Sequence, residues 1–413
     1  MTFRLFDASD TRAVERLIDR KPGRDPAIER RVARIVADVR RRGDRAVIEY
    51  ASRFDGLAGP IEVTRAELID GWRRTPRPER EALAAAARHI RRVARRQMPR
   101  PQAVDVAPGI RVEQRVAPLG RVGCYVPGGR YPLPSSLLMT ALPARVAGVA
   151  EVVAVCPRPA PIVMAAALEA GVTRLFRIGG AHAIAALAYG TRTVPRVDKI
   201  VGPGSAYVAA AKARVAADCA IDFFAGPSEI VIVSAAGNPD WIAADLIAQA
   251  EHDPDARAIL ITPSRRLAVE VARRIAARVT PAGPARIALA RGGGAIVTRS
   301  VAEAAAIASR IAPEHVVCDD EATAARITTA GTTFVGAFSA QAAGDYATGS
   351  NHVLPTAGAA RFRGGLSAAD FVRVSTIQRL TRRGLRRLAP VAVTLAKAEG
   401  LMAHAASIEV RLS

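Results

Sequence analysis

Residues 151–190, EVVAVCPRPA PIVMAAALEA GVTRLFRIGG AHAIAALAYG, contain one structural unit twice. Each copy begins with a short apolar strand, at 151–155 and at 174–178, and continues into an alanine-rich helix. The first helix is expected to start at Pro161 and to stop before Gly171, because proline suits the first position of a helix and glycine its end. Strands and helices that alternate at this spacing favour a parallel sheet with helices on its faces.

The same alternation continues in both directions from this stretch. Asn238 is a candidate N-cap, and SVAE at 300–303 is a capping box that opens another helix. The chain is therefore expected to be an α/β protein with two strand–helix arrays, and its 413 residues are enough for two or more domains. The residues predict further strands at 121–126, 198–201, 229–233 and 256–262, and further helices at 135–149, 205–219, 238–252 and 264–279.

Both ends of the chain are expected to be helical. Apolar residues recur at helical spacing over 24–56, and the tail from about residue 365 returns to that pattern. No apolar run approaches the ~18 residues of a membrane-spanning helix, and the charged start MTFRLFDASDTRAVERL has no apolar core of a signal peptide. We expect a soluble cytoplasmic protein without a membrane partner.

The composition raises a nucleic-acid partner but does not favour it. The formal net charge is +21, yet the arginines are spread over the whole chain and aromatic residues make up only 4% of it. No nucleic-acid motif interleaves aromatics with the basic runs at 89–100 and 381–390. We therefore expect solvated arginine-rich helix faces. The four cysteines form no C-x-x-C pair and are expected to be buried free thiols.

Three glycine-rich turns lie between a predicted strand and a predicted helix. They are Gly128-Gly129, Gly179-Gly180 and Gly202-Pro203-Gly204. At the carboxyl edge of a parallel sheet, such turns bring backbone N–H groups and helix N-termini to a ligand. Three turns in one array predict a ligand cleft, although GPGSAY lacks the full G-x-G-x-x-G fingerprint of dinucleotide-binding proteins.

A possible metal site begins in DLIAQAEHDPDA, residues 245–256. Gln249 and His252 stand three apart near a helix end, so both side chains are expected on one face. Imidazole nitrogens and oxygen ligands suit zinc or a neighbouring divalent ion, and Asp345 and His404 are candidates for a third and a fourth ligand. From the residues alone, a plain polar helix end remains the alternative.

Seven longer motifs carry a resemblance to a known family. The chain resembles histidinol dehydrogenases, whose fold is an intertwined homodimer of two Rossmann-like domains with a helical tail that reaches the partner. The resemblance implies an N-terminal arm (1–24), a body domain (25–120 and 229–364), a cofactor-side domain (121–228) and a tail (365–413). The motifs are RVGCYVPGG, VDKIVGPGSAYVAAAK, DFFAGPSEIVIV, AADLIAQAEHD, IAPEH, GDYATGSNHVLPTAGAARFRGGLS and EGLMAHAASIEVR.

The resemblance also implies an activity and a role for each site residue. The family oxidises L-histidinol to L-histidine through the aldehyde, with zinc and two NAD, as the last step of histidine biosynthesis. Glu314 and His315 match the acid/base pair, and the tail is expected to complete the partner's active site. The expected zinc ligands are Gln249, His252, Asp345 and His404; the expected substrate contacts are these four with Ser228, His315, His352 and Glu399; the expected cofactor contacts are Tyr125, His182 and Ser205.

Two positions depart from the family pattern, both on the cofactor side. His182 stands in GGAHA where the family usually reads GGAQA, and Ser205 stands in GPGS where it usually reads GPGN. They leave open a paralogous zinc/NAD dehydrogenase that acts on another polar alcohol, such as a sulfonated diol. Glu399 favours histidinol, because a carboxylate suits a cationic substrate. A basic nucleic-acid-binding protein is the alternative from a different class.

Overall fold

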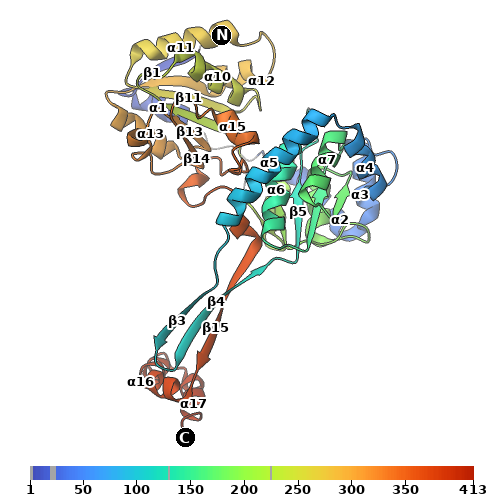
Figure 1. Ribbon diagram of the computed structural model, residues 1–413, viewed down its shortest axis with the longest axis vertical. Coiled ribbons are helices and arrows are strands. Elements are labelled where there is room, and N and C mark those ends of the chain that lie inside the picture. The colour runs from blue at the N-terminus through green and yellow to red at the C-terminus, as the bar shows by residue number, and fades with distance from the viewer. Residues whose placement is uncertain (1–2, 19–24, 129–130, 224–225) are drawn as a thin grey trace.

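The computed structural model describes residues 3–18, 25–128, 131–223 and 226–413. Figure 1 shows two lobes side by side and a long arm that extends away from both of them. Each lobe is built on a six-stranded sheet, and the arm carries a three-stranded one. The expected α/β architecture with two strand–helix arrays is therefore confirmed.

The first lobe is formed by the N-terminal residues and the second array. Its sheet is parallel throughout, in the order β1-β12-β11-β10-β13-β14. Helices α10, α11 and α12 cover one face, and α1 and α13 cover the other. The elements are β1 (Arg4–Asp7), α1 (Thr11–Ile18), β10 (Glu229–Val233), α10 (Pro239–Ala250), β11 (Arg257–Thr262), α11 (Arg265–Arg278), α12 (Pro284–Gly292), β12 (Gly293–Val297), α13 (Val301–Ile311), β13 (His315–Cys318), α14 (Glu321–Ala324), β14 (Thr332–Val335) and α15 (Gln341–Tyr346).

The second lobe is formed by the first array together with the helices that precede it. Its sheet has the order β2-β7-β6-β5-β8-β9, with only the edge strand β2 antiparallel to its neighbour. The elements are α2 (Pro26–Arg42), α3 (Asp44–Phe54), β2 (Glu62–Val63), α4 (Arg65–Arg74), α5 (Arg77–Arg96), β5 (Arg121–Tyr125), α6 (Pro134–Val146), β6 (Glu151–Val155), α7 (Pro161–Ala170), β7 (Arg174–Phe176), α8 (Gly180–Tyr189), β8 (Lys199–Val201), α9 (Ala206–Val215) and β9 (Ala220–Ile221).

The local signals read from the sequence are found in these elements. Helix α7 begins at Pro161 and ends at Gly171, whose φ of 71° is left-handed. The Asn238 side chain caps α10 by accepting from the Asp240 N–H, and Ser300 caps α13 by accepting from the Glu303 N–H. The Glu303 carboxylate accepts from the Arg299 N–H and not from the Ser300 N–H, so the expected capping box is only half formed. All four cysteines are buried and free, as expected. Within the described ranges, no helix is both long and apolar enough to cross a membrane.

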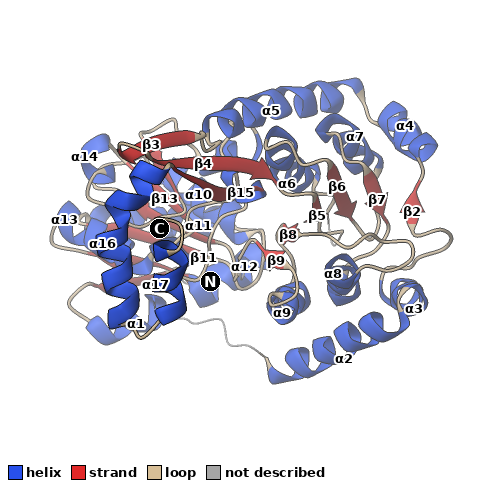
Figure 2. Ribbon diagram, turned by 90° about the horizontal axis from the view of Figure 1, so that it is seen from below, coloured by secondary structure: helices blue, strands red, loops and turns tan. Residues whose placement is uncertain are grey.

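The arm joins two segments that are distant in the sequence. Strands β3 (Gln102–Ala107) and β4 (Ile110–Pro118) form a hairpin, and β15 (Val372–Leu380) pairs with β4 along its whole length. Helices α16 (Arg382–Ala398) and α17 (Met402–Glu409) pack together at the far end of these strands, as Figures 1 and 2 show. The tail was expected to be helical, but its first part is a strand, because the hairpin supplies its backbone partners.

The grouping of the segments differs from the expected domain boundaries. Residues 25–120 were assigned to the body, yet α2 and α3 share a core with α8 and α9, and α4 and α5 share one with α6 and α7. Residues 1–24 were expected to be an arm, yet β1 completes the first lobe's sheet. Helical periodicity identifies an apolar face but not the surface that covers it, so the sequence could not assign these helices to a lobe.

Candidate active site

The candidate acid/base residues lie where two neighbouring strands of the first lobe begin. Ser228 and Glu229 lead into β10, and Glu314 and His315 lead into β13. These strands are adjacent and parallel, so their first residues meet at one edge of the sheet. The strand order reverses between β10 and β13, but the residues stand at the amino ends of the strands, opposite to the usual edge for ligands in such sheets.

His315 is held as a neutral base. Its Nδ1 lies 3.1 Å from the carbonyl oxygen of Glu229, which can only accept, so Nδ1 carries the proton and Nε2 keeps its lone pair. Burial lowers the pKa of His315 to about 4, which favours the uncharged ring at neutral pH. Nε2 lies 3.7 Å from Asp345 Oδ1 and 3.4 Å from Gln341 Nε2. The basic nitrogen therefore points toward the candidate metal ligand Asp345.

Glu314 is a buried carboxyl group beside this imidazole. Its Oε2 accepts from the Glu229 N–H at 2.9 Å and lies 3.7 Å from His315 Nδ1. Burial raises the pKa of Glu314 well above its usual range, while hydrogen bonds from the Glu229 backbone and from Ser228 oppose the shift. A carboxylate with a raised pKa is a stronger base than a surface glutamate, so this group is suited to proton transfer.

A short helix and the loop after it bring two more candidates to the site. Asp345 lies in α15, where Gln341 Nε2 donates to its Oδ2 at 2.8 Å. His352 follows, and its Nδ1 lies 2.8 Å from the Asp345 carbonyl oxygen, so Nδ1 carries the proton and Nε2 keeps its lone pair. Burial lowers the pKa of His352 as well. Asp345, His352 and His315 therefore form one cluster.

The second lobe fixes the loop that carries these residues. His89 in α5 places its Nδ1 2.6 Å from the carbonyl oxygen of Ala347. Asn351 Nδ2 donates to the carbonyl oxygen of Met139 in α6 at 2.7 Å. The site is consequently positioned by both lobes, and His89 takes part in that contact although it lies in the basic run 89–100, where a solvated helix face was expected.

The residues expected to bind a metal are only partly together in a single chain. Gln249 is fully buried in the last turn of α10, and neither polar atom of its side chain has a hydrogen-bond partner among the described residues. His252 follows the end of α10 and lies close to His315 and His352. A positive charge on His252 would lower the pKa of both of these side chains. Helix α10 packs against α15, which carries Asp345.

An amide left without a partner in a protein interior is costly, so the Gln249 side chain calls for a ligand. Together with imidazole and carboxylate groups, its oxygen makes a donor set that zinc accepts. Within the described part of the chain, no group of three or more His, Cys, Asp or Glu side chains is arranged to hold a metal. Of the three ligands expected from one chain, only His252 and Asp345 belong to these residue types, because the third is Gln249. The expected ligand set is therefore compatible with this result.

Glu399 and His404 lie outside this cluster. Glu399 ends α16, and His404 lies in the first turn of α17, so both belong to the far end of the arm (Figure 1). Both side chains are exposed. The single chain therefore does not bring the fourth expected zinc ligand to the other three.

Two of the expected cofactor contacts lie at the carboxyl edge of the second lobe's sheet. Tyr125 ends β5, and Ser205 follows the turn after β8; the strand order reverses between these two strands. That reversal is the usual position of a ligand crevice in an open parallel sheet. Ser205 is exposed and makes no capping hydrogen bond to α9. It remains a candidate contact.

The glycine turns at this edge do not offer all their N–H groups to a ligand, contrary to expectation. Gly179 N–H donates to Asp55 Oδ2 at 2.9 Å, Gly180 N–H donates to the Tyr125 hydroxyl at 3.0 Å, and Gly202 N–H donates to Asp222 Oδ2 at 2.7 Å. Buried acceptors thus already satisfy three of the donors that the sequence assigned to a ligand. Gly129 of the first turn lies outside the described residues.

Comparison with known proteins decides the family. Residues 18–412 match the family described as histidinol dehydrogenase. The chain belongs to the histidinol dehydrogenase family. It is therefore an oxidoreductase, as the resemblance implied.

The similarity extends over almost the whole chain. The histidinol dehydrogenase of Chromobacterium violaceum is 46% identical over 404 residues, which cover 94% of this chain and 93% of that protein. The one from Cereibacter sphaeroides is 47% identical over 410 residues, covering 96% and 94%. The solved structure of histidinol dehydrogenase from Elizabethkingia anophelis is 32% identical, superposes with a TM-score of 0.94, and covers 99% of this chain and 98% of that chain.

His182, one of the two departures from the family pattern, is buried inside the second lobe. His182 is 1% exposed, and its Nε2 lies 2.9 Å from Asp55 Oδ2, the same atom that accepts from Gly179. Tyr50 and Phe54 surround the ring at centroid distances of 6.0 and 6.5 Å. Its Nε2 is thus engaged within the protein, and contact of His182 with a cofactor stays a prediction.

Three residues that hold the site together were not singled out from the sequence. Glu229 orients both acid/base residues through its backbone N–H and carbonyl groups. The identity of a side chain does not predict such a backbone role. Gln341 and Asp55 are single polar residues in otherwise unremarkable stretches. No sequence signal pointed to Gln341, because it lies outside the motifs and its 1% exposure is known only from the fold.

Proposed function

We propose that this chain oxidises L-histidinol to L-histidine through the aldehyde, using zinc and two NAD, as a cytoplasmic homodimer with shared active sites. The observation that carries the proposal is the cluster in which the lone pair of a buried, neutral His315 faces Asp345, with Glu314 beside it. In a member of the histidinol dehydrogenase family, these are the groups that removal of a hydride and a proton from an alcohol requires.

Gln249, His252 and Asp345 of one chain, with the partner subunit's His404, would hold the zinc ion. When bound, zinc supplies a positive charge that orients the substrate's amine and imidazole and fixes the reacting carbon. The unsatisfied amide of Gln249 supports this assignment, because no partner for it exists among the described residues. Glu399 and His352 are proposed to contact the same substrate.

His315 moves the proton in both oxidations. Nε2 would take the hydroxyl proton as the alcohol becomes an aldehyde, and a bound NAD would accept the hydride that leaves the carbon. The Nδ1–H bond to the Glu229 carbonyl keeps the ring oriented throughout. That hydroxyl proton would pass from Nε2 to solvent before the second oxidation, in which Nε2 would take a hydroxyl proton from the aldehyde hydrate while a second bound NAD would accept the hydride.

Glu314 makes the hydrate possible. Its carboxylate would take a proton from water as the water oxygen forms a bond to the aldehyde carbon. The electron pair of the C=O π bond would move to the aldehyde oxygen, which would take that proton from Glu314 to give the hydrate. The Glu229 N–H on Oε2 keeps the carboxylate in place, while its raised pKa makes it an effective base when ionised. The carboxyl product retains that water oxygen.

The cofactor is proposed to bind at the reversal of strand order in the second lobe, near Tyr125, His182 and Ser205. The chain leaves the carboxyl edge of this sheet at Asp222 and reaches the amino edge of the other sheet at Ser228. A hydrogen bond from Gly226 N–H to Thr356 Oγ1 ties this crossover to the loop after His352. Only a few residues of the chain thereby connect the proposed cofactor site with the acid/base residues. This supports hydride transfer from a substrate at the acid/base residues to the cofactor.

The arm supports the shared-site dimer. Large apolar side chains are exposed along it, including Val374, Val391, Leu395, Met402 and Val410. Large apolar side chains that are exposed on one part of a protein are typical of a protein–protein interface. In a two-fold dimer, each arm would cover the other body and bring His404 and Glu399 to it.

One of the two departures that raised the sulfonated-diol alternative has a structural explanation. His182 is paired with Asp55 inside the lobe, so its presence has an explanation that does not involve another substrate. The relatives described above are all named histidinol dehydrogenase.

The metal assignment predicts about one zinc per chain in the purified protein. Replacement of His252 by alanine is expected to remove most of that metal, because the remaining ligands of one chain are too few to retain it. Elemental analysis measures the content, with Glu251→Gln, an exposed neighbouring change, as the control that should keep its zinc. Chelation of the wild-type protein should stop NAD reduction by L-histidinol. Full zinc retention in His252→Ala contradicts the ligand set.

A further inference from the structure

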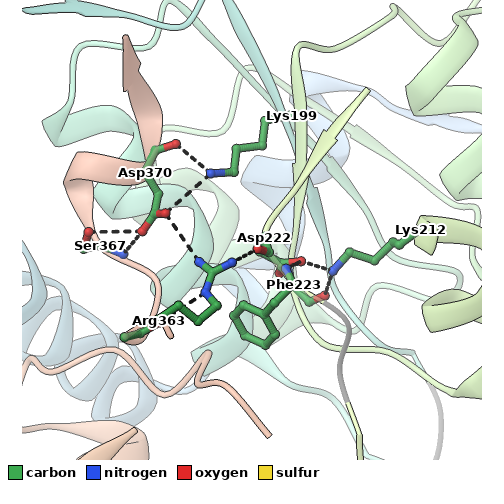
Figure 3. A network of polar contacts seen from close by, with 9 residues as sticks. Lys199, Lys212, Asp222, Phe223, Arg363, Ser367 and Asp370 are labelled. Carbon is green, nitrogen blue, oxygen red and sulfur yellow. Dashed lines mark hydrogen bonds and ion pairs between the residues drawn. The ribbon is translucent and has the colours of Figure 1, made fainter. Parts of the chain in front are cut away.

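A buried ion pair in the second lobe encloses a single glycine. Lys212 in α9 and Asp222 at the end of β9 are 2% and 3% exposed, and the Lys212 Nζ forms an ion pair with Asp222 Oδ1 (Figure 3). Lys212 Nζ also donates to the Gly202 carbonyl at 3.0 Å, and Asp222 Oδ2 accepts from the Gly202 N–H at 2.7 Å. One ion pair thus satisfies both backbone groups of Gly202.

Gly202 is a position that needs such a constraint. Its φ is +116°, and a Cβ placed there would lie 2.2 Å from the carbonyl oxygen of Tyr125. No side chain is tolerated, so the residue must be glycine, and glycine has more backbone freedom than any other residue. The conformation of the Gly202–Gly204 turn is therefore set by what its backbone binds, and here that is Lys212 and Asp222.

The turn lies between two candidate cofactor contacts. It begins against Tyr125 at the end of β5 and leads directly to Ser205 at the start of α9. A change in the Gly202 peptide would displace both sides of this crevice. The Asp222 carbonyl also accepts from Arg363, which lies 3.5 Å from Asp370, so the pair is braced by the segment that leads into the arm (Figure 3).

We propose that Lys212 and Asp222 are positioning residues for the dinucleotide, acting through Gly202. The inference rests on the proposed function, since it takes the second lobe as the NAD side. Neither residue touches the acid/base cluster in the described structure, so their effect should fall on the cofactor and not on the alcohol.

The test compares Lys212→Met with a matched change in the same network. Lys199→Met removes another largely buried lysine, which donates to the Asp370 carbonyl at 2.8 Å, with no contact to Gly202 among the described residues. Lys212→Met is expected to raise the KM for NAD by roughly tenfold, because the Gly202 carbonyl loses its donor and the turn its restraint. The KM for L-histidinol should stay within about twofold, and Lys199→Met should leave both constants within that range.

A double variant separates positioning from stability. Lys212→Met with Asp222→Asn is electroneutral and keeps an acceptor for the Gly202 N–H, so its melting temperature should recover relative to Lys212→Met alone. Its KM for NAD should remain raised, because the Gly202 carbonyl still lacks Lys212. A KM for NAD that returns to the wild-type value together with the melting temperature would mean that the pair acts on stability alone, and the inference would fall.

Calorimetric titration of NAD into the wild-type protein distinguishes failure of the proposed function from failure of the positioning role. Absence of binding there contradicts the proposed function itself. Binding to the wild type with equal affinity in Lys212→Met contradicts only the positioning role, as does an equal loss of NAD affinity in Lys199→Met.

Discussion

Replacing His315 by asparagine should slow both oxidations, by about a hundredfold to ten-thousandfold in kcat. Asparagine is shorter than histidine and its amide does not accept a proton near neutral pH, so the site loses its base while remaining polar. Both half-reactions need that base, because a proton leaves oxygen each time a hydride leaves carbon. Steady-state NADH formation from histidinol and from histidinal measures the two losses separately.

Glu314→Gln is the companion to this variant and should behave differently. The amide still accepts from the Glu229 N–H, so the local structure is kept, but it cannot take a proton from water. Oxidation of histidinal should be strongly impaired, while single-turnover oxidation of histidinol to the aldehyde should proceed at nearly the wild-type rate. Equal slowing of the two steps in Glu314→Gln would show that the division of labour is wrong.

Two inactive variants should restore activity when their subunits are exchanged. His252→Ala removes a body ligand and His404→Ala removes the arm ligand, so each homodimer should be inactive. In a mixed dimer with shared sites, one site receives both changes and the other receives neither. Random exchange makes half of the dimers mixed, so activity should return to roughly one quarter of the wild-type value.

The matched control is a mixture of His252→Ala with Asp345→Asn, two changes in the same body. Every site in those mixed dimers lacks a body ligand, so no activity should return. Mass spectrometry of differently tagged subunits verifies that exchange has occurred. Verified exchange without recovery in the His252→Ala and His404→Ala mixture would mean that sites are not shared, whereas the zinc ligands could still be correct.

Much of the two lobes could be predicted because their signals are local. Strand β10 is buried along its entire length and reads as the apolar run EIVIV, and Pro161, Gly171 and Asn238 mark helix ends through backbone chemistry that needs no distant partner. The cluster of Glu314, His315, Asp345 and His352 was predicted from resemblance, since their sequence spacing alone does not show that they meet.

The remainder depends on contacts between distant segments. Strand β15 pairs with β4, which lies more than 250 residues earlier in the chain. No pattern within VRVSTIQRL predicts which strand it pairs with. Helices α2 to α5 have clear apolar faces, yet only the folded chain shows that they cover the second sheet. Glu229 acts on the site through its backbone, and His182 meets Asp55 from 127 residues away, so neither role could be read from side-chain identity.

The stoichiometry of the complete reaction tests the central claim most directly. Purified protein, loaded with zinc, is given limiting L-histidinol and excess NAD, and NADH is measured by absorbance while the product is identified by mass spectrometry. Two NADH should form for each L-histidinol consumed, with L-histidine as the product. One NADH with accumulated aldehyde, or no reduction of NAD by L-histidinol at all, would contradict a four-electron histidinol dehydrogenase.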